Sequence, residues 1–160
     1  MTNLLLIEHM EFASEQFAIN DAKFNQYRNN AGQWEFILAF NNAQPVQVCN
    51  ELAELIQAEP DFEVTLMSPI EEPLEKGHLL YQAAGYCEQL NECLTNFYYF
   101  AHENVEKIKI ELLEAEPERL KLNLSGMTIV NGSNGKHCDA RLTLKEVIFQ
   151  RDTQLERSFY

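Results

Sequence analysis

The chain has 160 residues, of which 46% are hydrophobic and 23% are charged, a composition typical of one soluble globular domain. Its few glycines and prolines, 6 and 5, exclude the collagen-like and low-complexity classes. Acidic residues outnumber basic ones 25 to 12, which gives a formal net charge of −13. Because proteins that grip a phosphate backbone usually carry the opposite sign, we expect no nucleic-acid partner.

The sequence predicts a cytoplasmic protein. The apolar run at residues 4–7 ends at Glu8 and has no basic residue before it, so it is too short for a signal peptide. No stretch approaches the roughly 18 apolar residues of a membrane span, and we expect no membrane partner. The cysteines form no Cys-x-x-Cys motif, and we expect all of them to be reduced thiols: Cys49, Cys87, Cys93 and Cys138.

The N-terminal third has the pattern of β-strands. Residues 4–12 are rich in apolar residues compatible with a strand, and the asparagines and glycine of residues 29–32 indicate a turn. After this turn, aromatic and aliphatic residues alternate over 34–40. The second face of this segment is only partly polar, which predicts a strand covered on one side and half covered on the other.

A short helix is predicted over about residues 45–58. Val48, Leu52 and Leu55 fall on one face at a period of 3.6 residues, and Pro60 should end the helix shortly before it. Residues 62–66 then alternate again and predict a strand.

A longer helix is predicted over about residues 79–103. Gly85 within it costs about 1 kcal/mol relative to alanine, and the aromatic run at 97–100 should be buried or lie at an interface. The apolar stripe that supports the helix steps by three or four residues: Leu79, Ala83, Tyr86, Leu90, Leu94, Phe97 and Ala101.

The C-terminal third predicts a β-meander, with strands near 108–112, 120–124 and 142–149 and a turn at 131–135. The apolar phase changes within the last strand, which indicates a bulge near 145–146.

These patterns together predict a single α+β domain over residues 1–160. A largely antiparallel sheet is expected to pack against the long helix at 79–103 and the short helix at 45–58. The connection through 45–66 fits either a parallel crossover or an antiparallel return.

The sequence motifs that could indicate catalysis or metal binding are weak. The zinc-protease pattern that begins at His102 has Glu106 where a second histidine is needed. The neighbours His137, Cys138 and Asp139 resemble a catalytic set only in composition, since triads are assembled across a fold. We therefore expect no metal and no cofactor. Whether the protein is an enzyme stays open, with a non-catalytic protein favoured.

Charge is distributed unevenly along the chain. Residues 1–60 hold 8 acids and 2 bases, residues 61–118 hold 13 and 3, and residues 119–160 hold 4 and 7. Residues 51–75 contain eight acids and no base. Such a run can be a solvated face that keeps the protein in solution, or it can steer a cationic partner to a docking site.

We interpret residues 51–75 as the docking surface of a non-catalytic protein-binding module, of the immunity, inhibitor or adaptor kind, for a basic partner protein. The residues expected to carry this contact are the acids Glu51, Glu54, Glu59, Asp61, Glu71, Glu72 and Glu75 and the apolar anchors Ile70 and Leu74.

Two alternatives remain open. The run at 97–100 could join the subunits of a structural homo-oligomer. A small-molecule-binding or enzymatic domain could instead use an aromatic pocket lined by some of Trp34, Tyr81, Tyr86, Tyr98 and Tyr99.

Overall fold

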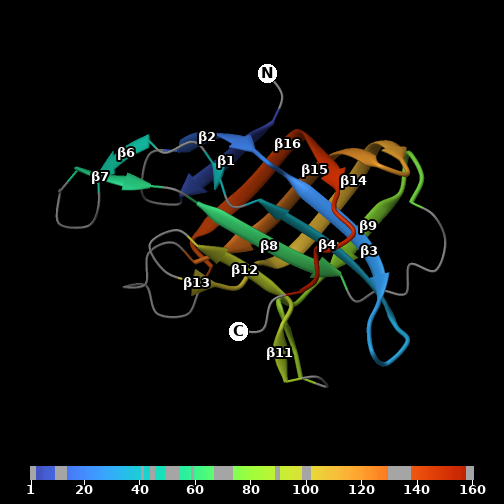
Figure 1. The fold of residues 1–160 in the computed structure, drawn as a ribbon. Coiled ribbons are helices and arrows are strands. Elements are labelled where there is room, and N and C mark those ends of the chain that lie inside the picture. Colours follow the sequence, from blue (N-terminus) through green and yellow to red (C-terminus); the bar gives the residue numbers. More distant parts are fainter. Residues whose placement is uncertain are drawn as a thin grey trace.

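The computed structural model describes residues 3–9, 14–40, 42–43, 46–49, 55–58, 60–66, 74–88, 91–98, 102–129 and 138–157. Within these ranges all regular elements are β-strands (Figure 1). None of the described residues forms a helix of the length and apolar character that crossing a membrane requires. The strands are β1 (Leu4–His9), β2 (Glu15–Asn20), β3 (Lys23–Arg28), β4 (Trp34–Phe40), β5 (Asn42–Ala43), β6 (Val46–Cys49), β7 (Leu55–Ala58), β8 (Asp61–Leu66), β9 (Leu79–Gln82), β10 (Tyr86–Cys87), β11 (Glu92–Cys93), β12 (Thr95–Tyr98), β13 (His102–Glu103), β14 (Glu106–Glu116), β15 (Arg119–Thr128) and β16 (Ala140–Arg151).

Strand β16 is the centre of the main sheet. One edge of β16 pairs with β15, while its other edge pairs first with β1 and then, at Gln150 and Arg151, with β3. The sheet continues from β3 through β4, β8 and β12 to β13, and from β15 through β14 to β9. Every pairing among the described strands is antiparallel except that of β3 with β16, which is parallel.

One apolar core joins the two halves of the sheet. Its buried side chains come from β1–β4 and β8 as well as from β12 and β14–β16, so the curved sheet encloses a single cluster. Aromatic rings fill its middle: Phe40 stacks on Phe62 with ring centroids 5.2 Å apart, and Phe24 meets Phe36 at 6.4 Å. These side chains are the alternating apolar residues of their strands, as period-two patterning requires.

Several local predictions are confirmed. Residues 34–40 form β4, and the turn before it places Gly32 at a φ of 78°, a conformation that suits glycine. The bulge predicted at 145–146 is present, because the pairing of β15 with β16 shifts between Leu122 and Leu124 and Glu146 has a φ of 51°. The turn at 131–135 lies outside the described residues.

The α+β fold class is wrong, and so is the short helix at 45–58. The described parts of that segment are strands β6 and β7, which pair antiparallel with Val46 opposite Ala58 and Val48 opposite Ile56. Short apolar runs fit either period, and β-branched residues at alternating positions favour the strand.

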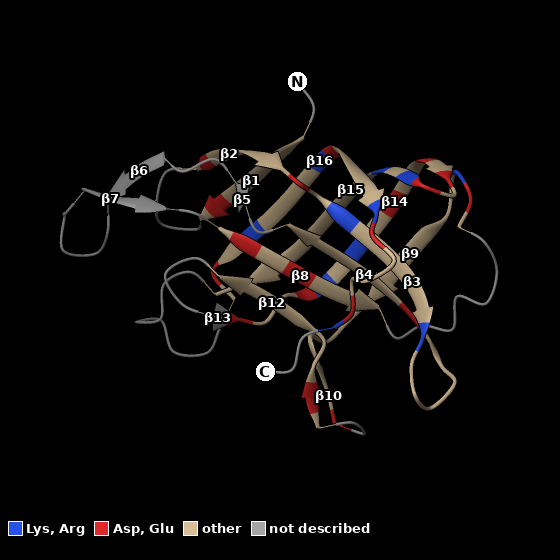
Figure 2. Cartoon of the chain, viewed as in Figure 1, with Lys and Arg blue, Asp and Glu red and all other residues tan. Residues whose placement is uncertain are grey.

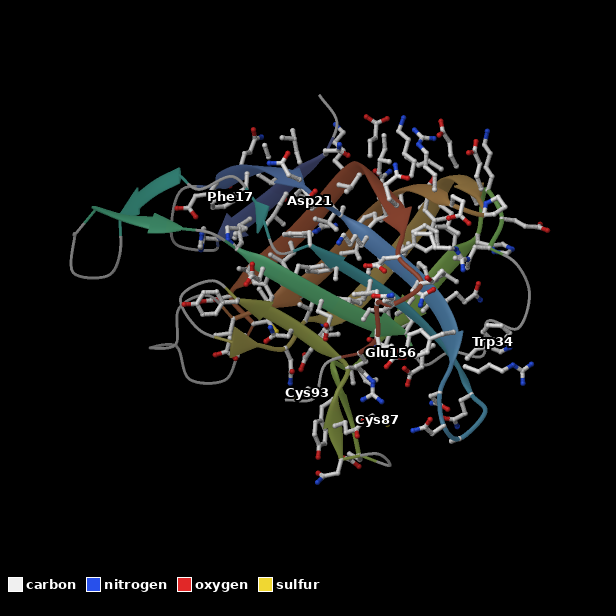
Figure 3. All side chains as sticks on the ribbon, in the orientation of Figure 1. Phe17, Asp21, Trp34, Cys87, Cys93 and Glu156 are labelled. Atoms are coloured by element: carbon white, nitrogen blue, oxygen red, sulfur yellow. The ribbon has the colours of Figure 1, made fainter. Side chains whose placement is uncertain are left out.

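The long helix at 79–103 is also wrong, because this segment forms strands β9 to β13 in the described residues. Gly85 gives one physical reason: a Cβ atom there would lie 2.3 Å from Thr95 Oγ1 and 2.7 Å from the Val105 carbonyl oxygen. The chain thus crosses itself closely at a residue without a side chain. Asn91, at a φ of 52°, helps to turn the β10–β11 hairpin, which projects from the body with Cys87 and Cys93 (Figure 3).

The C-terminal residues 152–157, here called the strap, lie on the outer face of β3. The backbone N–H of Asp152 donates to the Phe24 carbonyl, and Asn25 Nδ2 donates to the carbonyl of Leu155 at 3.0 Å. Further along, the Arg157 N–H donates to Tyr27 Oη at 2.9 Å. The strap therefore covers outward-facing residues of β3 and β4.

Candidate functional site

An open groove crosses the outer face of four neighbouring strands, β9, β14, β15 and β16, and encloses about 710 Å³. The strand register aligns one residue from each of these strands in a line across the sheet, with the side chains directed into or against the core. Because these side chains point inward, the backbone forms the floor of the groove. The floor residues are Leu80, Ile110, Leu124 and Leu144.

Two rows of outward-facing side chains form the walls. They flank the floor on either side, two residues apart along each strand, which separates them by roughly 7 Å. One row is Tyr81, Lys109, Ser125 and Thr143; the other is Leu79, Glu111, Asn123 and Lys145.

The two ends of the groove differ in character. At β9 the walls are apolar and open to solvent, with Leu79 exposed to 78% and Tyr81 to 56%. At β15 and β16 they carry the partly exposed hydroxyl residues Ser125 and Thr143 and the exposed Lys145. Such a combination of an apolar surface with a few polar groups is typical of ligand and partner sites.

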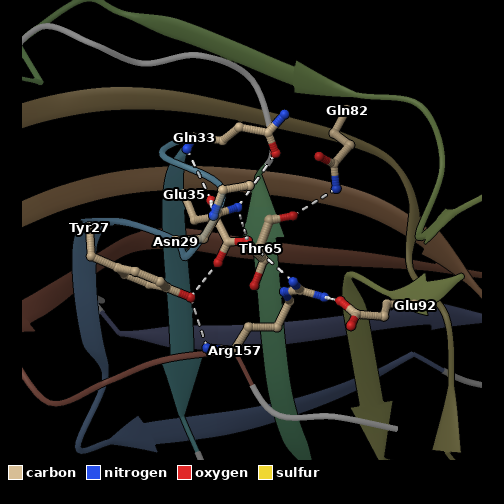
Figure 4. Close-up of polar contacts among 9 residues, drawn as sticks. Tyr27, Asn29, Gln33, Glu35, Thr65, Gln82, Glu92 and Arg157 are labelled. Atoms are coloured by element: carbon tan, nitrogen blue, oxygen red, sulfur yellow. Dashed lines mark hydrogen bonds and ion pairs between the residues drawn. The ribbon is translucent and has the colours of Figure 1, made fainter. Parts of the chain in front are cut away.

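A second cluster of polar side chains lies under the strap (Figure 4). Glu35 of β4 is only 2% exposed, and Arg157 Nη2 lies 3.2 Å from its Oε1 atom. The same carboxylate accepts hydrogen bonds from Tyr27 Oη at 2.5 Å and from Asn29 Nδ2 at 3.2 Å. The other guanidinium nitrogen, Nη1, pairs with Glu92 of the β10–β11 hairpin.

The protonation states of this cluster favour a structural role. Burial and the hydrogen bond to Glu35 raise the pKa of Tyr27 well above its usual range, so its hydroxyl stays a donor. Burial opposes the charge of Arg157, but Glu92 and Glu35 outweigh it and raise the pKa of the guanidinium. Tyr27 and Arg157 are thus each held in one protonation state by their neighbours, and the cluster fastens the strap to β4 and to the hairpin.

Cys138 does not have the surroundings of a nucleophile. Burial and the nearby Glu106 carboxylate raise the pKa of its thiol, whereas a reactive cysteine needs a lowered pKa. Asp139 beside it is 7% exposed, and His137 lies outside the described residues. The described cysteines Cys87, Cys93 and Cys138 are free thiols, as predicted for them, while the side chain of Cys49 is not described.

No group of three or more histidine, cysteine or acidic side chains gathers as a metal site would require in the part of the chain that the structure describes. The two ends of the weak zinc motif lie in different strands, with His102 in β13 and Glu106 in β14.

The predicted docking residues are only partly visible. Asp61 begins β8 and lies opposite Tyr98 of β12, whereas Glu75 precedes β9 and its backbone N–H donates to His78 Nδ1. Leu74 is half-buried against the core. The remaining predicted residues lie outside the described ranges: Glu51, Glu54, Glu59, Ile70, Glu71 and Glu72.

The aromatic residues expected to line a pocket come from several different elements. Tyr81 lines the groove, whereas Trp34 begins β4, Tyr86 lies in the β10–β11 hairpin and Tyr98 ends β12. Tyr99 lies outside the described ranges. Trp34 instead packs under the guanidinium of Arg28, whose Cζ atom lies 4.9 Å from the ring centroid.

Sequence reasoning missed both the groove and the buried cluster. The outward residues of β14–β16 follow the alternation of their strands, but only the register brings Lys109 beside Ser125 and Thr143. One available signal was the apolar second face of β4, where Ile37 accompanies Glu35 and indicates that something covers both.

Comparison with protein-family models, with curated proteins and with solved structures finds no match for this chain. Its function is therefore inferred from its own residues and their geometry.

Proposed function

We propose that this chain is a non-catalytic, cytoplasmic protein-binding module that presents the acidic run at 51–75 to a basic partner protein. Leu79 and Tyr81 supply the apolar anchors. The observation that carries this proposal is their exposure, 78% and 56%, on strand β9 only a few residues after Glu75.

The two features have complementary effects on binding. A run of eight acids without a base attracts a cationic partner over a distance and speeds encounter. Large apolar side chains that become buried in the complex lengthen its lifetime. Leu74, half-buried against the core, has less surface to offer than Leu79, so we assign the anchoring role to β9.

The charged clusters within the described residues support the non-catalytic part of the proposal. The Glu35–Arg157–Glu92 group fastens the strap, and the thiol of Cys138 faces a carboxylate. The free thiols of Cys87 and Cys93 suit a reducing compartment.

The test uses the whole chain as bait in a lysate of its source cell, followed by kinetics with the purified captured protein. Replacing Glu71, Glu72 and Glu75 by lysine should slow association, and added salt should slow that of the wild type in the same way. Replacing Leu79 and Tyr81 by serine should instead speed dissociation.

Tyr98→Ser is the matched control, because Tyr98 is also an exposed aromatic residue, at 37%, but lies on β12 away from the groove. Equal association rates for the wild type and the charge-reversed protein would refute the acidic docking surface. Equal dissociation rates for the serine variant would refute the anchors.

A homo-oligomer remains a second candidate. Its expected contact, the run at 97–100, exposes little apolar surface in its described residues. Phe97 is 1% exposed within the core, and only Tyr98 of the described part of the 97–100 run reaches the surface. Light scattering of the purified chain would decide between a monomer and an oligomer.

A further inference from the structure

The groove carries positive charge although the chain as a whole carries a net charge of −13. Lys109 lies in one wall and Lys145 in the other, and both residues are exposed. Neither takes part in an ion pair with another described residue, whereas Arg119 pairs with Glu114 and Lys23 with Asp152. The ammonium groups of both lysines are therefore available to a ligand in the groove.

The two lysines lie on either side of strand β15 in the groove. Lys109 and Lys145 lie on β14 and β16, about 10 Å apart across the sheet and about 7 Å apart along the strands, with β15 between them. Their long side chains can both reach a group placed over Ser125 of β15. Ser125 and Thr143, paired across β15 and β16, present two hydroxyl donors at the same place.

The other end of the groove suits an apolar group. Leu79 and Tyr81 lie on β9 in opposite walls, and both are largely exposed. Glu111 pairs directly with Leu79 and Lys109 with Tyr81, so their opposite charges offset each other beside β9, whereas Lys145 at β16 has no acid among the groove residues of its own strand. The groove is therefore polarised along its length, from an apolar end at β9 to a cationic end at β16.

We propose that this groove binds an amphipathic anion, a small molecule with an apolar or aromatic body and one carboxylate or sulfonate group. The anionic group lies over Ser125 between Lys109 and Lys145, and the body lies between Leu79 and Tyr81. The groove volume of about 710 Å³ is in the range of small-molecule sites. This site is independent of the acidic docking surface, although it shares two side chains with the proposed anchors.

The test uses the isolated full-length chain and the probe 1-anilinonaphthalene-8-sulfonate, which has an aromatic body and one sulfonate. We expect saturable binding, with laurate as a competitor for the carboxylate form of the same chemistry. The uncharged analogue N-phenyl-1-naphthylamine should bind more weakly, because it has the body without the anion.

Replacing Lys109 and Lys145 together by glutamine should weaken probe binding by about tenfold, since each exposed charge contact contributes modestly. The control is Lys121→Gln, which removes one positive charge from β15 outside the groove and should leave binding unchanged. Circular dichroism of each variant establishes that the fold is retained. Amide chemical-shift changes on probe binding should be confined to β9 and β14–β16.

Two results would overturn the proposal. The first is probe affinity that is equal in the wild type and in the Lys109→Gln, Lys145→Gln protein. The second is equal affinity for the sulfonate and for the uncharged analogue. Because no partner protein takes part, either result leaves the proposed function untouched, and loss of partner binding leaves this site untouched.

Discussion

Two regions of the same outer sheet surface differ in whether the chain covers them. Over β3 and β4 the strap makes hydrogen bonds to outward-facing side chains, and Ile37 and Glu35 are almost completely buried, at 0% and 2% exposure. Over β9 the equivalent outward positions are open, with Leu79 exposed to 78% and Tyr81 to 56%. Figure 2 shows charged residues on β3 and β4 and, around the groove, on β14–β16, so the presence of charge alone does not separate the two regions.

The polar groups follow this difference in cover. Under the strap a carboxylate must be fully paired, because a buried charge without a partner is costly. Glu35 accordingly has Arg157, Tyr27 and Asn29 around it. Around the open groove Lys109 and Lys145 can remain without an ion pair at little cost, since water solvates them. A closed face therefore uses its charges for stability, whereas the charges of an open face stay accessible to a ligand.

The largest expected effect comes from breaking the covered face at its ion pair. Arg157→Met keeps much of the side-chain volume but leaves Glu35 buried without its cation, which should lower the free energy of unfolding by about 3–5 kcal/mol. Urea unfolding monitored by circular dichroism measures this change.

Arg119→Met is the control, because the ion pair of Arg119 with Glu114 is exposed and should matter little to stability. The double variant Glu35→Gln, Arg157→Met should be more stable than Arg157→Met alone, since it removes the stranded charge. If Arg157→Met and Arg119→Met unfold at the same urea concentration, the strap is not fastened by this pair.

A smaller effect is expected from the apolar residues of the two regions. Ile37→Ala should destabilise the protein by about 2–5 kcal/mol, because its side chain is completely buried. Leu79→Ala should change stability by no more than about 0.5 kcal/mol, because its side chain already contacts water. Thermal and urea unfolding of the two variants measures both losses of stability. Similar losses for Ile37→Ala and Leu79→Ala would contradict the contrast between the covered and the open region.

Sequence patterns predicted the parts of this fold whose alternation is unambiguous. Strand β4 and the bulge near Glu146 both follow from apolar residues at a period of two and from a change in its phase. The helix predicted over residues 79–103 was wrong, because the apolar spacing of this segment also fits a helical stripe. The decisive facts there are tertiary, namely the close approach of Thr95 and Val105 to Gly85.

The site was harder to predict than the strands. The groove depends on which residues of β9, β14, β15 and β16 stand side by side, and a shift of one residue would turn Lys109 or Lys145 to the other face. The buried cluster joins Glu35 to Arg157, 122 positions later in the chain. No local pattern can indicate contacts of that separation.

Among the variants expected to lose stability, the smallest loss concerns the hydroxyl of Tyr27, which links the strap to Glu35. Because the folded state raises the pKa of Tyr27 above its unfolded value of about 10, the stability that results is complete below that pH and is lost as pH rises above it. Tyr27→Phe should cost about 1 kcal/mol at neutral pH through its lost hydrogen bonds, and its stability should then fall less steeply than that of the wild type in alkaline solution. Urea unfolding at a series of pH values from neutral to alkaline measures both effects.

Tyr81→Phe is the control, since it alters an exposed hydroxyl of the open groove and should leave the alkaline slope of the wild type intact. Identical alkaline slopes for Tyr27→Phe and the wild type would show that the covered face does not hold this proton, and the contrast between the two regions would then rest on the Arg157 ion pair alone.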